Sequence, residues 1–208
     1  MKKTAILERK LLSQDSLHIY EVYHDTVECL TAALDARDQY TRGHSSRVAD
    51  MVVLMAQGFK LTAAELETIH IAAHLHDIGK IAIPDAILFK TGLLTAEERT
   101  VIEQHPVIGS KILCSSRHLH DVAMLVLHHH ERWDGRGYPA KLQGTAIPLG
   151  SRIIAICDAI EAMLSDRPYR KALTTEQCRE QLLAGRDGQF DAMLVGIALD
   201  IFFSGLQA

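Results

Sequence analysis

The sequence predicts an all-α protein, folded as a compact multi-helix bundle in one domain. Apolar residues recur at intervals of three and four along most of the chain, which is the pattern of helices with one buried face. No segment shows the alternation of apolar and polar residues that is typical of a strand. The chain has 208 residues, of which 48% are hydrophobic and 23% charged, so it is long enough and apolar enough to bury one sizeable core.

The elements follow from this periodicity in order along the chain. Helices are predicted at residues 17–37, 44–57, 62–77, 95–113, 119–131, 150–164, 174–184 and 190–204. Thr62 and Thr95 are predicted N-caps because acidic residues follow each of them in the first turn, and Gly79 is a predicted C-cap. Residues 134–150 contain four glycines and two prolines without periodicity, and a loop of this length in a compact domain is usually functional or disordered.

The chain divides into a lead-in, residues 1–30, which includes the start of the first helix, and a main domain, residues 31–208. Two interpretations of the first helix stay open, a dimerising helix that would make a homodimer and a helix that faces the core, and the second is favoured. Both rest on the same apolar spacing, which comprises Leu17, Tyr20, His24, Val27, Leu30 and Leu34.

Composition excludes several classes of protein. No apolar run approaches the roughly 20 residues of a membrane-spanning helix, and the first twenty residues lack a cleavable signal, so we expect a cytoplasmic protein without a membrane partner. The four cysteines form no CxxC pair, which argues against a disulfide framework. A formal charge of -4 argues against binding to nucleic acid polymers, which requires a basic face.

Histidine is the unusual residue, with twelve in the chain, several of them beside acidic residues. In HLHDIGK, His76 and Asp77 are adjacent near a predicted helix end, where an imidazole can bind one ion and the carboxylate can bridge to a second. A lone His-Asp pair also occurs by chance as a polar pair at a helix end. Its meaning therefore depends on the other histidines.

Further candidate ligands lie in apolar surroundings, where unpaired imidazoles and carboxylates are costly to desolvate. They are His44 in TRGHSSRV, His105 in EQHPVIG, His129 and His130 in HHHERWDG, and Asp158 in RIIAICDAIEAM. Together with His76 and Asp77 they offer five imidazoles and two carboxylates. Such a mixed set suits iron, manganese, nickel or zinc rather than calcium.

These motifs closely resemble the HD-GYP subgroup of the HD-domain metal-dependent phosphohydrolases. The resemblance is carried, in order, by HDIGK at 76–80, the HP of His105 and Pro106, HHERWDGRGYP at 129–139 and DAIEAMLSDRPYR at 158–170. It extends from about Ala33 to about Phe190. It implies an HD-domain helical bundle with a long GYP loop at residues 134–150.

The resemblance also implies a site and a reaction. Its metal ligands are His44, His76, Asp77, His105, His129, His130 and Asp158, with Asp77 bridging two divalent ions. Iron or manganese is favoured, and nickel and zinc also fit the ligands. The expected reaction is hydrolysis of a cyclic dinucleotide such as cyclic di-GMP to the linear dinucleotide by a metal-bridging hydroxide, with His76, Asp77 and Lys80 as catalytic residues. Whether hydrolysis continues to GMP stays open.

Substrate contacts are expected at Lys80, Arg167 and Arg170 for the phosphates, and at Asp38 for orienting the nucleotide. A cation near a helix end and surface ion pairs are the alternative interpretations of these basic residues. The GYP stretch, Gly137, Tyr138 and Pro139, is expected to close the site on one side, and the resemblance implies that it can dock a diguanylate cyclase domain.

Two alternatives and two negative expectations complete the interpretation. A nucleotidase of the wider HD superfamily would lack the HHE and GYP segments, and a receptor or scaffold that binds without cleaving would be expected to lose ligands. Some family members carry a Glu four residues before the His44 position as a ligand of a third ion; Tyr40 stands there, so two ions are expected. The remaining histidines match no ligand position and are left out of the site: His18, His24, His70, His74, His118, His120 and His128.

Overall fold

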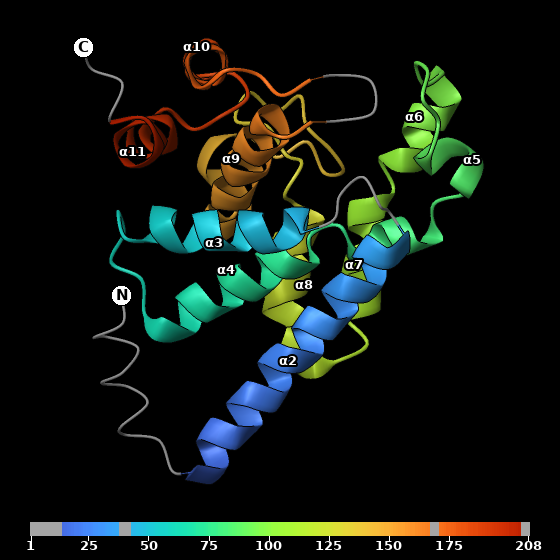
Figure 1. Ribbon diagram of the computed structural model, residues 1–208, viewed down its shortest axis with the longest axis vertical. Helices are drawn as coiled ribbons and strands as arrows, with labels where there is room; N and C mark the ends of the chain where they lie inside the picture. Colours follow the sequence, from blue (N-terminus) through green and yellow to red (C-terminus); the bar gives the residue numbers. More distant parts are fainter. Residues whose placement is uncertain (1–13, 38–42, 167–170, 205–208) are drawn as a thin grey trace.

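The computed structural model describes residues 14–37, 43–166 and 171–204, with side chains from residue 21 onward (Figure 1). Its α-helices are α2 (Gln14–Arg37), α3 (His44–Ala56), α4 (Ala63–Leu75), α5 (Asp85–Leu88), α6 (Ala96–Ile102), α7 (His105–Leu113), α8 (His120–Leu127), α9 (Leu149–Leu164), α10 (Thr175–Ala184) and α11 (Ala192–Phe202). Short 3-10 helices are η2 (Ile78–Ala82), η3 (Arg117–Leu119) and η4 (Gly144–Ala146). No strand is present in these ranges, so the predicted all-α bundle is confirmed.

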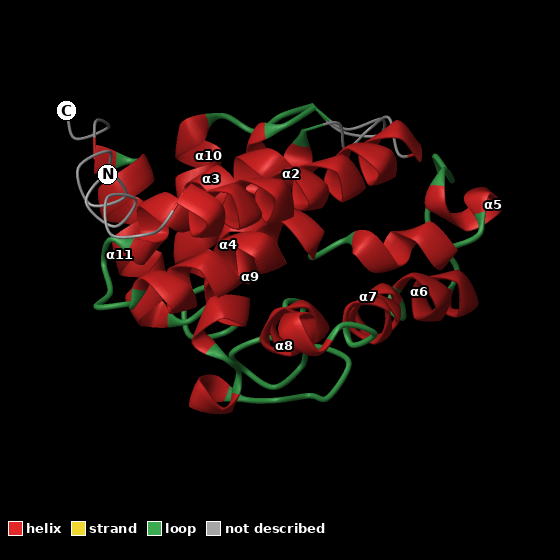
Figure 2. Ribbon diagram, turned by 90° about the horizontal axis from the view of Figure 1, so that it is seen from below, coloured by secondary structure: helices red, strands yellow, loops and turns green. Residues whose placement is uncertain are grey.

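Helix α4 occupies the middle of the bundle, where it contacts α2, α3, α8 and α9. Helix α9 packs in turn against α3, α10 and α11, whereas α7 packs against α8 and η2. Both ribbon views place α10 and α11 at the end of the molecule opposite α5 and α6 (Figures 1 and 2). The C-terminal ends of α4 and α8 and the start of α7 lie near the start of α3 and the middle of α9.

Side-chain caps set the starts of several helices. Thr62 and Thr95 each accept a hydrogen bond from the backbone N–H three residues later, and the glutamate at that position bonds back to the N-cap, which makes a capping box. Both predicted N-caps are confirmed. Thr174 and Gln177 form the same box at the start of α10. Each cap satisfies N–H groups that have no partner inside the helix, which contributes about 1 kcal/mol.

The core is built from aliphatic side chains of α3, α4, α9, α10 and α11. Ile153, Ile154, Ile156 and Ile160 of α9 are fully buried, and burial of each such side chain stabilises the fold by about 1.5–3 kcal/mol. Such a core holds α9 rigidly against α3 and α4. Among the described helices, none has the length and apolar character needed to cross a membrane.

Two predicted helices are shorter than the periodicity indicated. The predicted helix 95–113 is two helices, α6 and α7, because Pro106 in the first turn of α7 has no N–H with which to continue α6. Helix α8 ends at Leu127, so His129 and His130 lie in the following turn and not on a helix.

Gly79 has a different function from the predicted C-cap of α4, because it lies inside η2 and α4 already ends at Leu75. A Cβ at Gly79 would lie 1.9 Å from the carbonyl oxygen of His105 and 2.6 Å from the backbone nitrogen of Gly109. Only glycine therefore allows η2 and α7 to pack this closely.

Helix α2 is attached to the bundle along one face. Its Val27, Thr31 and Leu34 are buried, whereas Leu30 is exposed, so the favoured interpretation of a core-facing helix is confirmed for this face. At its end, the guanidinium of Arg37 donates hydrogen bonds to the carbonyl oxygens of Lys80 (2.8 Å), Ile81 and Ile83 (2.5 Å) and pairs with Asp85 (2.8 Å).

Candidate metal centre

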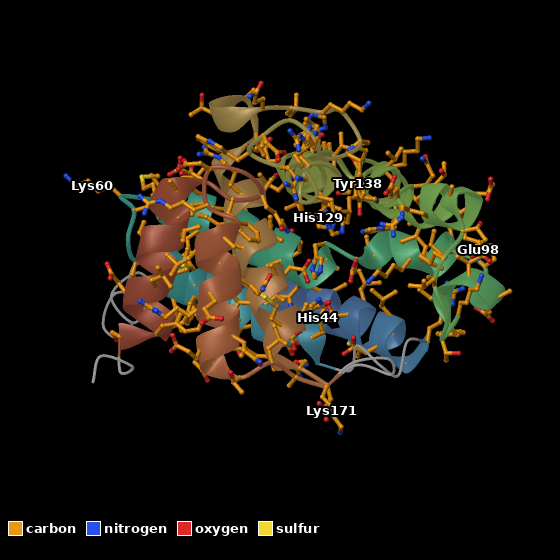
Figure 3. The ribbon with its side chains drawn as sticks, turned by 90° about the horizontal axis from the view of Figure 1, so that it is seen from above. His44, Lys60, Glu98, His129, Tyr138 and Lys171 are labelled. Carbon is orange, nitrogen blue, oxygen red and sulfur yellow. The ribbon has the colours of Figure 1, made fainter. Side chains whose placement is uncertain are left out.

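The predicted ligands come from five separate segments and gather in one place. His44 is the first residue of α3, His76 and Asp77 follow α4, and His105 is the first residue of α7. The turn after α8 supplies His129 and His130, and α9 supplies Asp158. Close contacts between ligand atoms link all of them, and Figure 3 shows His44 and His129 on either side of the same interior region, with Tyr138 nearby. The structure thus brings together the whole predicted ligand set.

Backbone hydrogen bonds fix the orientation of three imidazoles. In each, Nδ1 lies within hydrogen-bond distance of the carbonyl oxygen three residues earlier, so Nδ1 carries the proton and donates it. The pairs are His76 with Ala73 (2.7 Å), His105 with Ile102 (2.8 Å) and His129 with Val126 (2.6 Å). This tautomer leaves the Nε2 lone pair of each ring free, which is how proteins commonly hold histidines that bind metals.

Those lone pairs point at one another. The Nε2 atoms of His105 and His129 are 3.3 Å apart, and neither carries a proton to donate when Nδ1 is the donor. The Nε2 atom of His76 is buried and has no hydrogen-bond partner among the described residues. Two nitrogen lone pairs that face each other without a proton between them repel. A cation bound by both nitrogens would remove this repulsion. The donor set therefore fits a metal ion.

Asp77 lies between two groups of imidazoles. Its Oδ1 is 3.4 Å from Nε2 of His105, and its Oδ2 is 3.4 Å from Nε2 of His76. Burial alone would raise the pKa of this carboxyl, but the charge of Lys80 and the nearby imidazoles outweigh burial and hold the pKa well below its ordinary value. An ionised carboxylate with one oxygen directed to each group can bridge two ions.

The side chain of Lys80 points toward the centre. Its ammonium is 2.6 Å from Oδ2 of Asp77, the oxygen that also faces His76. The predicted contact to substrate phosphate thus stays a prediction, and in this structure Lys80 neutralises the carboxylate.

His44 has two carboxylate partners, one on each ring nitrogen. Nε2 lies 3.1 Å from Oδ1 of Asp158, and Nδ1 forms a short contact with Glu161. Burial lowers the pKa of His44, yet the hydrogen bonds to Asp158 and Glu161 outweigh it and raise the pKa to about 9. Arg47 and Ser165 in turn donate to Glu161 at 2.8 and 2.7 Å, which fixes the carboxylate.

Glu161 was not among the predicted site residues. It matches no ligand position, because it bonds to a ligand and not to the centre itself. A signal exists in its spacing, since Glu161 follows Asp158 by three residues on α9 and therefore lies on the same face.

The GYP stretch closes one side of the centre. The ring of Tyr138 packs on His130 with centroids 5.0 Å apart, and the Tyr138–Pro139 peptide bond is cis. A Cβ at Gly137 would lie 2.4 Å from the backbone nitrogen of Arg132, so this close approach requires glycine. Burial raises the pKa of the Tyr138 phenol above its ordinary value, so the phenol stays protonated.

Glu131 is a second residue missed by the sequence analysis. Its buried carboxylate accepts hydrogen bonds from the backbone N–H groups of Ala140 (2.7 Å) and Leu142 (3.1 Å). The glutamate of the HHE segment therefore shapes the loop from inside instead of facing the centre.

Four predicted positions lie outside the described residues. These are the expected substrate contacts Asp38, Arg167 and Arg170, and Tyr40, on which the expectation of two ions rests.

Three histidines that the sequence analysis set aside are not dispersed. His24, His70 and His74 form a second group of close ligand atoms, separate from the predicted ligands. The sequence analysis left them out of the predicted ligand set, and the structure places them beside one another outside that set.

Comparison with known proteins identifies the family to which the chain is similar. A family model described as "HD domain" matches residues 28–194. The chain is 40% identical over 195 residues to the cyclic di-GMP phosphodiesterase response regulator RpfG of Xanthomonas campestris pv. campestris, a match that covers 93% of this chain and 51% of the relative. It is 41% identical over 182 residues to 3'3'-cGAMP-specific phosphodiesterase 2 of Vibrio cholerae, covering 86% of this chain and 35% of the relative. The chain thus spans about half or less of these relatives.

A solved structure supports the fold. The cyclic GMP-AMP specific phosphodiesterase V-cGAP3 of V. cholerae superposes with a TM-score of 0.66 at 22% identity, covering 86% of this chain and 49% of that one. At this identity the likeness concerns the arrangement of helices.

Proposed function

Because the chain belongs to the HD-domain family, we propose that it is a metal-dependent phosphodiesterase that hydrolyses a cyclic dinucleotide, with cyclic di-GMP as the leading substrate. One observation carries the proposal: the ionised carboxylate of Asp77 has one oxygen facing His105 and the other facing His76. A centre built for two adjacent cations suits phosphodiester hydrolysis, which needs an activated water and neutralised phosphate charge.

The proposed residue functions follow from the contacts. His105, His129 and His130 would hold one ion, His44, His76 and Asp158 the other, and Asp77 both. Two divalent ions, iron or manganese being favoured, would supply the activated water and stabilise the charge on the scissile phosphate. This explains how a chain with a net charge of -4 can bind an anionic substrate.

The protein's own contribution is position and shape. The carbonyl partners of Nδ1 keep His76, His105 and His129 in their binding tautomer before any ion arrives. Tyr138 covers His130 and thereby limits the access of water from that side. Lys80 would be within reach of a phosphate held by ions beside Asp77, where its ammonium would offset phosphate charge.

The substrate class rests on the relatives. RpfG is named for cyclic di-GMP and the V. cholerae relative for 3'3'-cGAMP, so the shared feature is a cyclic dinucleotide. We propose the linear dinucleotide as the first product. Docking of a diguanylate cyclase domain on the GYP loop, and a homodimer through the first helix, stay predictions.

The test joins metal content and turnover on one sample. Protein purified anaerobically should contain close to two iron or manganese ions per chain and hydrolyse cyclic di-GMP; 3'3'-cGAMP and a deoxynucleotide are assayed beside it. Asp77→Ala should abolish turnover and lower the metal content while far-UV circular dichroism stays unchanged. Asp200→Ala, an exposed aspartate on α11, is the matched control and should behave as the unaltered protein.

Two results would contradict the proposal. Full turnover in Asp77→Ala would show that the carboxylate does not organise the reaction. Binding of cyclic di-GMP by the metal-loaded protein without any cleavage would favour the receptor alternative.

A further inference from the structure

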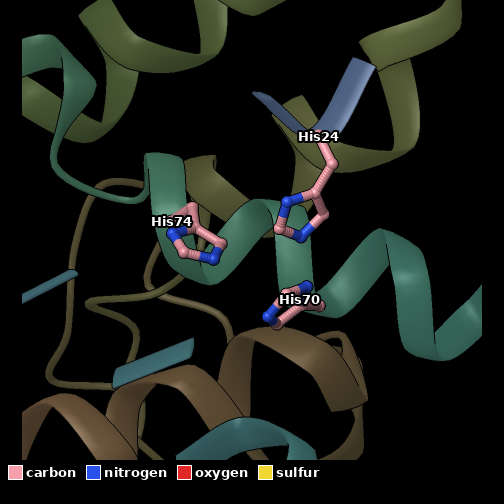
Figure 4. Close-up of side chains that lie close together, drawn as sticks. All are labelled: His24, His70 and His74. Carbon is pink, nitrogen blue, oxygen red and sulfur yellow. The ribbon is translucent and has the colours of Figure 1, made fainter. Parts of the chain in front are cut away.

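A second histidine cluster lies on the opposite side of α4 from the metal centre. Its members are His24 of α2 and His70 and His74 of α4, and one ligand atom of each lies within 4.8 Å of those of the other two (Figure 4). His74 precedes His76 by two residues, a rotation of about 200° around a helix, so the two side chains leave α4 on different sides. The cluster shares no residue with the centre described above.

The three rings are arranged as ligands of one ion would be. His70 and His74 are four residues apart, so they lie on one face of α4, and their ring centroids are 4.8 Å apart with planes at 81°. His24 enters from α2, with centroids 5.4 Å from His70 and 5.8 Å from His74 (Figure 4). Three histidines from two helices thus surround one small volume.

The environment of the rings favours a cation. His74 is 5% exposed, and its Nδ1 is buried without a hydrogen-bond partner among the described residues, which is unfavourable unless something binds there. Burial lowers the pKa of His70, so its imidazole is neutral at neutral pH and keeps a lone pair for a metal. The charge of Glu67 acts on His70 and would partly offset that of a bound dication.

The surroundings also include a residue that can orient a ligand. Glu28 lies one turn after His24 on α2, with Oε1 3.5 Å from Nδ1 of His24. A carboxylate on one ring nitrogen directs the other nitrogen toward a metal, an arrangement common around zinc. The side chain of His24 is 24% exposed, which leaves a path for an ion from solvent.

We propose that His24, His70 and His74 form a second metal site, for Zn²⁺ or a similar borderline divalent ion, that fastens α2 to α4. Three imidazole nitrogens without a bridging carboxylate suit zinc, nickel or cobalt rather than manganese. Zinc would complete its tetrahedral geometry with a water. At a Zn–N distance of 2.0–2.1 Å the nitrogens would be about 3.3 Å apart, so the rings need to approach by about 1.5 Å at most, within reach of side-chain rotation.

The ion would add to an existing contact between the two helices. The hydroxyl of Thr31 on α2 lies 3.3 Å from the carbonyl oxygen of His74. With an ion bound, α2 would be fixed to α4 just before the segment that carries His76 and Asp77. The site is therefore structural, and we expect its loss to leave turnover largely unchanged.

The experiment counts ions in matched variants. The unaltered protein, His70→Gln, His24→Gln and, as control, His118→Gln at an exposed position outside both clusters, are loaded with excess Co²⁺ or Zn²⁺, dialysed and analysed for metal. His70→Gln and His24→Gln should each hold one ion fewer per chain than the unaltered protein, and His118→Gln the same number. With Co²⁺, the spectrum of the unaltered protein minus that of either variant should contain a visible absorption band of tetrahedral Co²⁺.

A graded variant tests the orienting carboxylate. Glu28→Gln should keep the extra ion but weaken its binding by about ten- to a hundredfold in competition with a chromophoric chelator. Because only the difference between proteins is used, the result does not depend on whether the first centre binds metal. Equal ion counts in all four proteins, with circular dichroism showing each to be folded, would overturn the proposal.

Discussion

Among single residues, His44 differs from the other proposed ligands in its protonation. Contacts with Asp158 and Glu161 raise its pKa to about 9, whereas burial lowers the pKa of His105 to about 3 and that of His130 to about 4. At neutral pH the metal-free protein therefore carries a proton on His44 and none on the other two. A metal binds only the neutral imidazole, so the ion at His44 must displace this proton.

We expect metal binding at pH 7 to release the proton of His44. The Glu161→Gln protein should release fewer protons when it binds metal. The neutral amide removes the negative charge that holds the proton, so the pKa of His44 falls toward its ordinary value. Metal affinity of the unaltered protein should accordingly increase as pH rises from 6 toward 9, with a weaker dependence in the variant. Calorimetric titration in two buffers of different ionisation enthalpy measures the released protons, and an equal release from both proteins would contradict the assignment.

Lys80→Ala should weaken turnover without removing metal. The ammonium pairs with Asp77 in this structure, but a bound ion would take that oxygen and leave the ammonium for phosphate. A charge-assisted contact contributes about 1.5–3 kcal/mol, so we expect a loss of roughly ten- to a hundredfold in turnover. Lys60→Ala, at an exposed position far from the centre (Figure 3), is the control. Loss of metal in Lys80→Ala would mean that Lys80 acts only through Asp77.

The sequence predicted which residues meet in the structure better than it predicted the residues that support them. Each predicted ligand belongs to a short motif in which a His or Asp stands in apolar surroundings, so its type and context mark it. Glu131 and Glu161 belong to the same motifs, yet one holds a loop and the other holds His44. Their functions depend on which backbone or ring they reach in three dimensions, and spacing along the chain does not give that.

For the secondary-structure elements, the close packing of η2 against α7 decides where Asp77 lies. Gly79→Ala would place a Cβ 1.9 Å from the carbonyl oxygen of His105, and both partners there are backbone, which cannot rotate away. We expect a destabilisation of about 1–3 kcal/mol or more and a loss of metal, because Asp77 and His105 would separate. Chemical denaturation and metal analysis measure the two effects.

Gly196→Ala is the matched control, because a Cβ there meets nothing within 4 Å and the position is inside α11. Alanine should stabilise this helix by about 0.5–1 kcal/mol. If Gly79→Ala were as stable as this control and kept its metal, the packing of η2 on α7 would not determine the centre.

The helices were predicted in order and approximate position better than at their ends, although the predicted helix 95–113 is two helices and the short helix α5 was not predicted. Apolar periodicity reports which residues face the core, and this burial continues past the last helical hydrogen bond. His128 and His129 are buried in the turn after α8, so the periodicity runs on through a segment that is no longer helical. Only Pro106 marked the break between α6 and α7, and a proline is also tolerated in the first turn of a helix.

In the molecule as a whole, the centre joins segments that are distant in the sequence. His44 and Asp158 are more than a hundred residues apart, and the proposed ligands come from the starts of α3 and α7, the middle of α9 and the segments after α4 and α8. Bound ions should therefore stabilise the native state as a ligand does.

Removal of metal should lower the melting temperature. An ion present at 100 times its dissociation constant adds about 2.7 kcal/mol, which corresponds to roughly 5–10 °C for a domain of this size. Differential scanning calorimetry with manganese and with a chelator measures the shift, and manganese avoids the histidine cluster proposed for zinc. His129→Ala should show a reduced shift, and a melting temperature independent of manganese would argue against a preformed centre.

Arg37 attaches the end of α2 to residues 80–85. The guanidinium of Arg37, at the end of α2, donates hydrogen bonds to three carbonyl oxygens and a carboxylate within residues 80–85. This segment begins three residues after Asp77. Moving α2 relative to this segment would break all four contacts. We therefore expect α2 and residues 80–85 to move together. A displacement of α2 along its axis would therefore reach the backbone three residues after Asp77, the carboxylate proposed to bridge two ions.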